Sequence, residues 1–425
     1  MPKSRWSPFV APSLMAAATA ASVACAAPDA ISPVAPLQAA QGLDDVIEAK
    51  GGKASWSLLG IIGHDNDLSG SAPRYRQAAQ SLAQINGLNS ALVLDTPGQE
   101  GVEVMGFNGQ VVASRDKEVN TGGAEFVGTF LTWSAKNFPS DARLLSMADH
   151  GGGIVRGIMV DDSSGHAGIR IPDFAAVLDK QRVNVVAFDA CLMQMVEVAY
   201  ELRGGADTII AAESVTYAGA WPYEAIGRAL AQGGNPEQAS YRVVDAIGPQ
   251  VYRSTVSAVR TAGARNAAGA LDQFAKVAID KMRGNPRFKE EIAGAIARGQ
   301  SYKFSDDQRF NLYAGYRDMI STARSLQKVS DPDIAGAAKE VERAAKAMVI
   351  RSWRDEGHYP DSNGVSFYAP VDGTVDLGYA KNSALAKDTQ WDEFLVALNS
   401  RGNFGNPLQK DKYPTAFPRF IFPGK

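Results

Sequence analysis

Short apolar runs alternate along this chain with stretches that show helical periodicity. The apolar runs have the length of buried strands and occupy residues 56–62, 90–95, 144–148, 183–188, 208–212 and 255–260. Amphipathic patterns predict helices over 75–85, 124–136 and 266–282, and the alternation about Asn108-Gly109 predicts a hairpin over 101–114. This order is typical of an α/β fold in which helices cover both faces of a mainly parallel central sheet.

The same patterns divide the chain into segments. Residues 1–26 combine a basic start at Lys3 and Arg5 with an apolar middle and a small-residue end, which predicts a bacterial export signal peptide. Residues 27–50 are rich in Ala and Pro and indicate a linker. We expect one domain over 51–400, with a core over 51–265 and a helical extension over 266–400, followed by an irregular tail over 401–425.

Cys25 allows a second interpretation of the N-terminus. The run Ser22-Val23-Ala24-Cys25 is close to a bacterial lipid-attachment site, although Ser22 stands where such sites favour an aliphatic residue. We expect export to the periplasm or the extracellular space, with a lipid anchor on Cys25 as the alternative. No other run reaches the roughly 18 apolar residues that a membrane span requires, so we expect no transmembrane span in the mature chain.

Composition narrows the function classes. Hydrophobic residues make up 45% of the chain and charged residues 21%, which is ordinary for a globular protein with a sizeable core. The formal net charge of −3 gives no indication of a nucleic-acid partner, and we expect none. Removal of the signal would leave Cys191 as the one cysteine, which is then either a buried filler or a reactive thiol.

Two reactive side chains follow predicted strands, at the edge where α/β sheets bind their ligands. His150 precedes three glycines, and Cys191 follows 41 residues later, after Asp189-Ala190. A crossover of this length can place both residues on neighbouring parallel strands. A predicted helix start at Cys191 would lower the pKa of its thiol, and His150 could take the thiol proton. The backbone N–H groups of Gly151 and Cys191 could then stabilise an oxyanion.

Each of these residues has a plainer interpretation when taken alone. A cysteine at a strand end is more often buried filler, and a histidine there is more often a core or capping residue. The string HGGG also occurs as an oxyanion loop of lipase-like esterases, but we find no G-x-S-x-G elbow here. The occurrence of both residues, in the order His then Cys, favours a cysteine nucleophile.

The residues around this pair resemble the clostripain-type cysteine peptidases. The resemblance rests on ADHGGG at 148–153 and on FDACLMQMVEVAYELRGGADTIIAAESVTYAGAWPYEAI at 188–226, and it extends to GHDNDLSG, VNTGGAEFVGTFLTW and NGVSFYAP. It covers roughly residues 55–400. It implies a caspase-like three-layer sandwich and a His150–Cys191 dyad that cleaves proteins or peptides after Arg or Lys.

The resemblance also implies roles for further residues. Asp189 matches the acid that binds the substrate's Arg or Lys, although an Asp just before a predicted helix could instead cap that helix. Glu213, Trp221 and Tyr223 would line the same pocket; the alternative is a cap for the acid and core packing for the aromatic residues. Many family members carry an aromatic residue soon after the glycines, where this chain has Ile154-Val155, a change that could alter the shape of the pocket.

Activation and metal binding complete the expectations. Members of this family are often activated by self-cleavage between the His and the Cys, which would here follow Arg156 or Arg170 unless these are ordinary surface charges. The chemistry requires no cofactor, but calcium helps some relatives. Asp161-Asp162 and His166 match neither an EF-hand loop nor a zinc motif, so a solvated turn is the plainer interpretation and we expect no metal ligands.

Two function classes follow from these patterns. The leading one is an exported cysteine endopeptidase that forms an acyl-thioenzyme. The alternative is a catalytically silent relative that binds peptides or acts at the cell surface, against which the intact His150, Cys191 and Asp189 argue.

Overall fold

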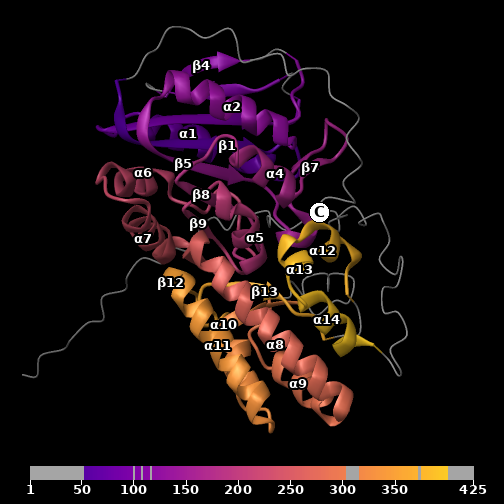
Figure 1. The fold of residues 1–425 in the computed structure, drawn as a ribbon. Coiled ribbons are helices and arrows are strands. Elements are labelled where there is room, and N and C mark those ends of the chain that lie inside the picture. Colours follow the sequence, from indigo (N-terminus) through magenta and orange to yellow (C-terminus); the bar gives the residue numbers. More distant parts are fainter. Residues whose placement is uncertain are drawn as a thin grey trace, which may run out of the picture.

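The fold is a broad sheet with helices on both faces and a helical extension at one end (Figure 1). The computed structural model describes residues 52–98, 101–106, 109–114, 117–302, 315–371 and 375–400. The expected signal peptide with Cys25, the linker and the tail lie outside the described residues. Within the described ranges, no helix is both long and apolar enough to span a bilayer.

The strands form one large sheet and two small ones. They are β1 (Ala54–Gly63), β2 (Leu88–Asp95), β3 (Glu103–Met105), β4 (Val111–Ser114), β5 (Ser140–Ala148), β6 (Ile158–Asp161), β7 (Ala167–Ile169), β8 (Val185–Asp189), β9 (Thr208–Ala211), β10 (Thr255–Arg260), β11 (Tyr316–Asp318), β12 (Val349–Arg354) and β13 (Ser366–Tyr368). The nine-stranded sheet has the order β12-β10-β9-β8-β5-β1-β2-β3-β4, while β6–β7 and β11–β13 are separate pairs.

The middle of the large sheet is parallel and its edges are antiparallel. Strands β2, β1, β5, β8 and β9 run parallel, as the uninterrupted apolar runs predict. The hairpin predicted over 101–114 is present as β3–β4, and β10–β12 closes the opposite edge. All five parallel strands therefore end at the same rim of the sheet, and both predicted reactive residues follow such ends.

The helices occur throughout the described chain. They are α1 (Ala72–Leu82), α2 (Ala124–Asn137), α3 (Gly153–Arg156), α4 (Ile171–Leu178), α5 (Val196–Glu201), α6 (Tyr223–Ala231), α7 (Pro236–Ile247), α8 (Ala264–Gly284), α9 (Arg287–Ala297), α10 (Met319–Leu326), α11 (Pro332–Met348), α12 (Leu377–Asn382), α13 (Ala384–Asp388) and α14 (Trp391–Asn399), with short 3₁₀ turns η1 (Ser69–Ser71), η2 (Leu202–Gly204), η3 (Gly248–Gln250) and η4 (Thr261–Gly263). Local sequence explains several starts: Asn235 forms a capping box ahead of Pro236, and the side chain of Asp331 caps α11.

Alternation along each strand produces two separate cores. On β5, Leu144 and Ala148 face a core shared with α1, α6 and α7. Leu145 and Met147 face the other core, which contains α2, α4, α5 and α8. Burial of both faces gives the expected three-layer sandwich, and successive residues after a strand end can therefore point to different layers.

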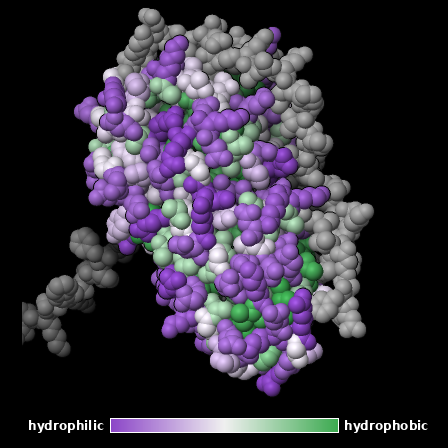
Figure 2. All heavy atoms as spheres, in the orientation of Figure 1, coloured by the Kyte–Doolittle hydropathy of each residue, from purple (hydrophilic) through white to green (hydrophobic). Residues whose placement is uncertain are grey.

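The described residues after 265 form mostly helices, together with strands β11, β12 and β13. Helices α8, α10, α11 and α14 pack on one another, and their apolar side chains continue the core beneath β8 and β9. Strand β12 returns from this region to pair with β10 in the main sheet. On the face in Figure 2, hydrophilic side chains predominate, with small hydrophobic patches over the extension. The helices after 265 thus share one continuous core with the large sheet.

Candidate active site

The loops that carry His150 and Cys191 lie against each other. Strands β5 and β8 are parallel neighbours, with Ala148 opposite Asp189. Beyond the strand ends, a Cβ added to Gly151 would lie 2.4 Å from the carbonyl oxygen of Cys191 and 3.1 Å from its nitrogen. No side chain fits in that space, which explains a glycine directly after His150. The spacing of His150 and Cys191 predicted a crossover between neighbouring parallel strands, and β5 and β8 are connected in this way.

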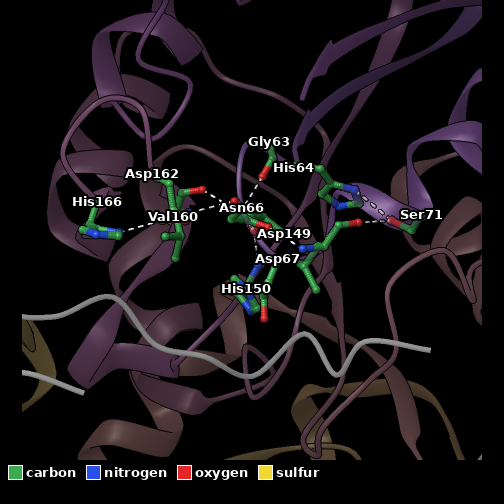
Figure 3. Close-up of polar contacts among 11 residues, drawn as sticks. Gly63, His64, Asn66, Asp67, Ser71, Asp149, His150, Val160, Asp162 and His166 are labelled. Carbon is green, nitrogen blue, oxygen red and sulfur yellow. Dashed lines mark hydrogen bonds and ion pairs between the residues drawn. The ribbon is translucent and has the colours of Figure 1, made fainter. Parts of the chain in front are cut away.

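His150 is almost fully buried and is paired with a carboxylate (Figure 3). Its Nε2 lies 2.6 Å from Oδ1 of Asp67, in the segment between β1 and α1. The His150 side chain is 2% exposed and that of Asp67 is 51% exposed. Desolvation acts to raise the pKa of Asp67, but the hydrogen bond and the charge of His150 lower it overall, so the carboxylate stays ionised.

Asp149 anchors the start of the His150 loop. Its Oδ2 accepts a 2.7 Å hydrogen bond from the N–H of Val160, and its Oδ1 accepts from the Asn66 amide at 2.9 Å and from the N–H of His150 at 2.6 Å. Burial raises the pKa of Asp149 to about 7, against the lowering effect of His150 and of these hydrogen bonds. The loop is therefore held by a buried polar network before any ligand arrives.

The glycines after His150 leave one backbone donor directed away from β6. The N–H of Met159 donates to the carbonyl of His150 at 3.1 Å, and the N–H of Gly152 donates to Gly157 at 2.9 Å. Gly151 is the non-hydrogen-bonded residue of this antiparallel bridge, so its N–H points to the other side. This arrangement is compatible with the oxyanion role expected for Gly151.

The prediction that a helix begins at Cys191 is wrong. Leu192 has φ of +63°, which is incompatible with a helical turn, and its N–H donates to the carbonyl of Ser214 at 3.0 Å. Helix α5 begins only at Val196. Cys191 therefore lies in a turn, and the positive end of a helix does not act on its thiol.

Cys191 has a different polar neighbour. Its side chain is buried, and its Sγ accepts a 3.2 Å hydrogen bond from the backbone N–H of Thr216. A donor of this kind favours a thiolate over a thiol.

Asp189 is a buried carboxylate, and one of its oxygens has no hydrogen-bond partner in the described chain. Oδ2 accepts a 2.9 Å hydrogen bond from the Tyr75 hydroxyl and a 3.4 Å one from Tyr223, whereas Oδ1 is buried without a partner in the described chain. Burial raises the pKa of Asp189 to about 7, although the two tyrosines act to lower it. Asp189 does not cap α5, whose N-cap residue is Met195, so the alternative role as a helix cap is wrong.

Comparison with known proteins places this geometry in a family. The model of the clostripain family of peptidases matches residues 81–399. The chain belongs to the clostripain family. Clostripain from Hathewaya histolytica is 35% identical over 138 residues, which are 28% of this chain and 26% of that protein. The match thus spans about a quarter of the length of this curated relative.

Solved structures share the fold of this clostripain-family chain at low identity. An inactive zymogen C11 protease from Parabacteroides distasonis has a TM-score of 0.59 at 19% identity, over 81% of this chain and 99% of that one. A secreted C11 cysteine protease from Bacteroides thetaiotaomicron, in complex with an irreversible peptide inhibitor, has a TM-score of 0.60 at 17% identity, over 80% and 100%. These likenesses confirm the predicted caspase-like fold class.

Of the expected pocket residues of this clostripain-family chain, Tyr223 contacts Asp189. Trp221 and Tyr223 are buried in the same core cluster as Tyr75, on the face of the sheet toward which Asp189 points. The N–H of Gly219, in the loop before Trp221, donates to the Tyr75 hydroxyl at 3.0 Å. The Tyr75 hydroxyl therefore links the loop before Trp221 to the carboxylate of Asp189.

The structure does not bring Glu213 into this group. Glu213 is buried, and its Oε2 accepts a 2.9 Å hydrogen bond from the N–H of Gly364 in the extension. Burial raises the pKa of Glu213 well above its usual value, and the nearby Asp318 raises it further. Glu213 thus faces the layer opposite to Asp189, where it joins the sheet to the extension.

The acidic turn after β6 contains two separate arrangements. Asp162 pairs with His166 on the surface, at 2.6 Å between Oδ1 and Nδ1. Asp161 instead lies with Asp65 and Glu118, and one oxygen of each falls within 4.8 Å of the others. Within the described ranges, the group that could hold a cation is therefore Asp65, Glu118 and Asp161, which shares only Asp161 with the set considered from sequence.

The two candidate self-cleavage residues differ in exposure. Arg156 ends α3 and forms an ion pair of 3.7 Å with Asp376. Arg170 is exposed and pairs with Asp173, but the next residue, Ile171, is fully buried in the core. Cleavage after Arg170 would require the start of α4 to open.

Sequence reasoning missed two residues that contact the candidate site: Asp67, between β1 and α1, contacts His150, and Tyr75, in α1, contacts Asp189. Asp67 lies in the GHDNDLSG stretch that contributes to the family resemblance, and Tyr75 stands at the start of a predicted helix. The available signal was position: Asp67 follows a buried parallel strand, where ligand and catalytic groups gather. The hydrophobic periodicity of the sequence does not show that Asp67 would contact the loop of His150.

Proposed function

We propose that this protein is an exported cysteine endopeptidase that cleaves peptide bonds after Arg or Lys. The observation that carries the proposal is Asp189 with its buried, unpartnered Oδ1, two residues before Cys191 and on the strand next to the His150 strand. A lone buried carboxylate oxygen is costly unless a donor reaches it, and a substrate cation would supply that donor.

The reaction uses groups of this chain alone. The Cys191 thiol gives its proton to His150, and the thiolate attacks the carbonyl carbon of the scissile bond. The N–H groups of Gly151 and Cys191 would stabilise the oxyanion, each by roughly 3–4 kcal/mol. As the C–N bond breaks, His150 gives the proton to the leaving amine. Water, deprotonated by His150, then hydrolyses the thioester and restores the thiol.

Substrate selection follows from the environment of Asp189. Its pKa of about 7 reflects burial without a cation, and a guanidinium or ammonium at Oδ1 would favour the charged form. The side chain is only 2% exposed, so a substrate cation must displace part of its surroundings, which include Tyr75 and Tyr223. The Tyr75 hydroxyl also accepts a hydrogen bond from the N–H of Gly219, so a shift of Tyr75 would be felt in the loop before Trp221.

Peptide substrates ending in Arg, Lys, Leu or Asp test the proposal, with processed wild type and Cys191→Ala under reducing conditions. We expect turnover with Arg or Lys only, and none in the variant. Asp189→Asn should lower kcat/KM for the basic substrates by at least about 100-fold, because the charge pair is lost in a buried site. Equal turnover of the Leu substrate would remove Asp189 from this role.

A catalytically silent protein is the second candidate, favoured by the burial of both Cys191 and Asp189. The same assay separates the two, since a silent relative hydrolyses none of the peptides even after reduction and N-terminal processing. Calcium as an accessory ion is tested there by adding EDTA and then excess Ca²⁺.

Export and processing are part of the proposal. The secreted Bacteroides protease with the same fold supports export, together with the predicted signal peptide. Intact-mass measurement of protein from the culture medium and from membranes distinguishes cleavage near residue 26 from a lipidated Cys25. The same spectra show whether the chain is nicked after Arg156 or Arg170.

A further inference from the structure

We infer that Asp67 is a positioning residue that orients His150, so that the site works as a Cys191–His150–Asp67 triad. The inference rests on the proposed function and deepens it. The carrying observation is the 2.6 Å contact between Asp67 Oδ1 and His150 Nε2. This distance lies just below the range of about 2.7–2.9 Å that is typical of charge-assisted N–H···O hydrogen bonds.

The contact specifies the chemistry of both ring nitrogens. An ionised carboxylate can only accept, so Nε2 carries the hydrogen and Nδ1 holds the lone pair. Nδ1 is therefore the atom that takes the thiol proton of Cys191 and later gives it to the leaving amine. Asp67 remains ionised throughout and stabilises the imidazolium while it exists, as the carboxylate of a serine-protease triad does.

Backbone and side-chain contacts on both sides hold Asp67 in place. The Asn66 amide donates to Asp149 at 2.9 Å and to the carbonyl of Val160 at 2.7 Å, and the Asn66 side chain accepts from the N–H of Leu68 at 2.9 Å. The residues before Asp67 and before His150, Asn66 and Asp149, are thus also joined by a hydrogen bond (Figure 3). Two adjacent links fix the orientation of the carboxylate and the ring together.

Other titratable groups near His150 have different contacts. His64 is buried, and desolvation, followed by the positive charge of His150, lowers its pKa to about 3, so it stays neutral. Its Nδ1 contacts the Ser71 hydroxyl at 2.9 Å. Asp149 contacts the backbone N–H of His150 rather than the ring. Asp67 therefore supplies the carboxylate that orients the imidazole.

The test compares Asp67→Asn and Asp67→Glu with wild type, using Asp162→Asn as a matched control. The control removes a carboxylate that pairs with His166 at the same 2.6 Å on the surface. We expect Asp67→Asn to lower kcat by about 10-fold or more with little change in KM, since proton transfer to a positioned base contributes about 100-fold or more. The alkaline limb of kcat/KM should move to lower pH, and Asp67→Glu should restore part of both effects.

A substrate-independent measurement keeps this inference separate from the proposed specificity. The rate at which iodoacetamide alkylates reduced Cys191 is followed against pH in the same variants. A changed pH profile in Asp67→Asn, with the control unchanged, supports the triad even if no Arg or Lys peptide is cleaved. Identical profiles and equal kcat in wild type and Asp67→Asn would overturn it, as would higher activity in the variant.

A second variant covers the case in which Asp67→Asn does not fold. Asp67→Gly leaves a half-exposed space for a small carboxylate, so millimolar formate should restore activity with saturation, whereas chloride should not. Folding is checked by thermal unfolding. Activity of Asp67→Gly equal to wild type without formate would also contradict the triad.

Discussion

The Tyr75 hydroxyl donates a 2.9 Å hydrogen bond to Oδ2 of Asp189 and leaves Oδ1 as the oxygen without a partner in the described chain. A guanidinium pairs best with both oxygens of a carboxylate, whereas an ammonium needs only one. The arrangement therefore bears on which basic side chain the site prefers.

Tyr75→Phe is expected to raise the preference for Arg over Lys. Loss of the Tyr75 hydroxyl leaves Oδ2 with only the 3.4 Å hydrogen bond from Tyr223, so Oδ2 can accept a second hydrogen bond from Arg, which Lys cannot supply. The ratio of kcat/KM for matched Arg and Lys peptides should rise about 3- to 10-fold, equivalent to roughly 1 kcal/mol. Tyr200→Phe, whose hydroxyl bonds Asp388 instead, is the control. An unchanged ratio would show that Oδ2 plays no part in selection.

Gly151→Ala is expected to lower activity strongly. The added Cβ would lie 2.4 Å from the carbonyl oxygen of Cys191, so one of the two loops has to move. Displacement of the oxyanion donor should reduce kcat by about 100-fold or more. Gly70→Ala places its Cβ in open space and should retain activity. The kinetics are compared after circular dichroism confirms folding; wild-type turnover in Gly151→Ala would contradict the close approach of the two loops.

Tyr316→Phe is expected to loosen the glycine loop from the side of the extension. The Tyr316 hydroxyl donates to the carbonyl of Gly152 at 2.7 Å and is buried. The carbonyl would keep only the long 3.4 Å hydrogen bond from the N–H of Arg156, so the free energy of unfolding should fall by about 0.5–1.5 kcal/mol. We also expect a several-fold lower kcat with little change in KM. Denaturant titration and steady-state kinetics measure the two effects, and an effect on KM alone would point to substrate binding instead.

Glu197→Gln is expected to flatten the fall of stability with rising pH. Burial raises the pKa of Glu197 from 4.5 to about 7, while hydrogen bonds from Tyr368 and Tyr379 act to lower it. The folded state therefore binds more protons than the unfolded state between these values, so the contribution of Glu197 is largest below pH 4.5 and is lost as pH rises to 7.

Denaturant titrations at about pH 5 and about pH 8 measure this effect. The difference in free energy of unfolding between the two should shrink by about 1–3 kcal/mol in the variant. The exposed Glu290→Gln serves as control. A variant that keeps the full wild-type pH dependence would show that Glu197 is not its source; Asp149 and Asp189 would then be the next candidates, since burial raises their pKa in the same direction.

Local sequence patterns were sufficient to predict the α/β class, the parallel strands and the two loops that carry His150 and Cys191. These features follow from periodicity and from the rule that parallel neighbours end at one rim, and the structure has β5 beside β8 as that rule requires. The family resemblance added the identity of Asp189 as a candidate pocket residue.

The groups that surround these residues could be identified only from the packed fold. Asp67 meets His150 across 83 residues, and Tyr75 meets Asp189 across 114, because β1 lies beside β5 in the sheet order. The turn after Cys191 also escaped prediction, since Leu192 takes φ of +63° and its N–H bonds Ser214 instead of starting a helix. Such contacts depend on the packing of distant segments, and no local pattern in the chain carries that information.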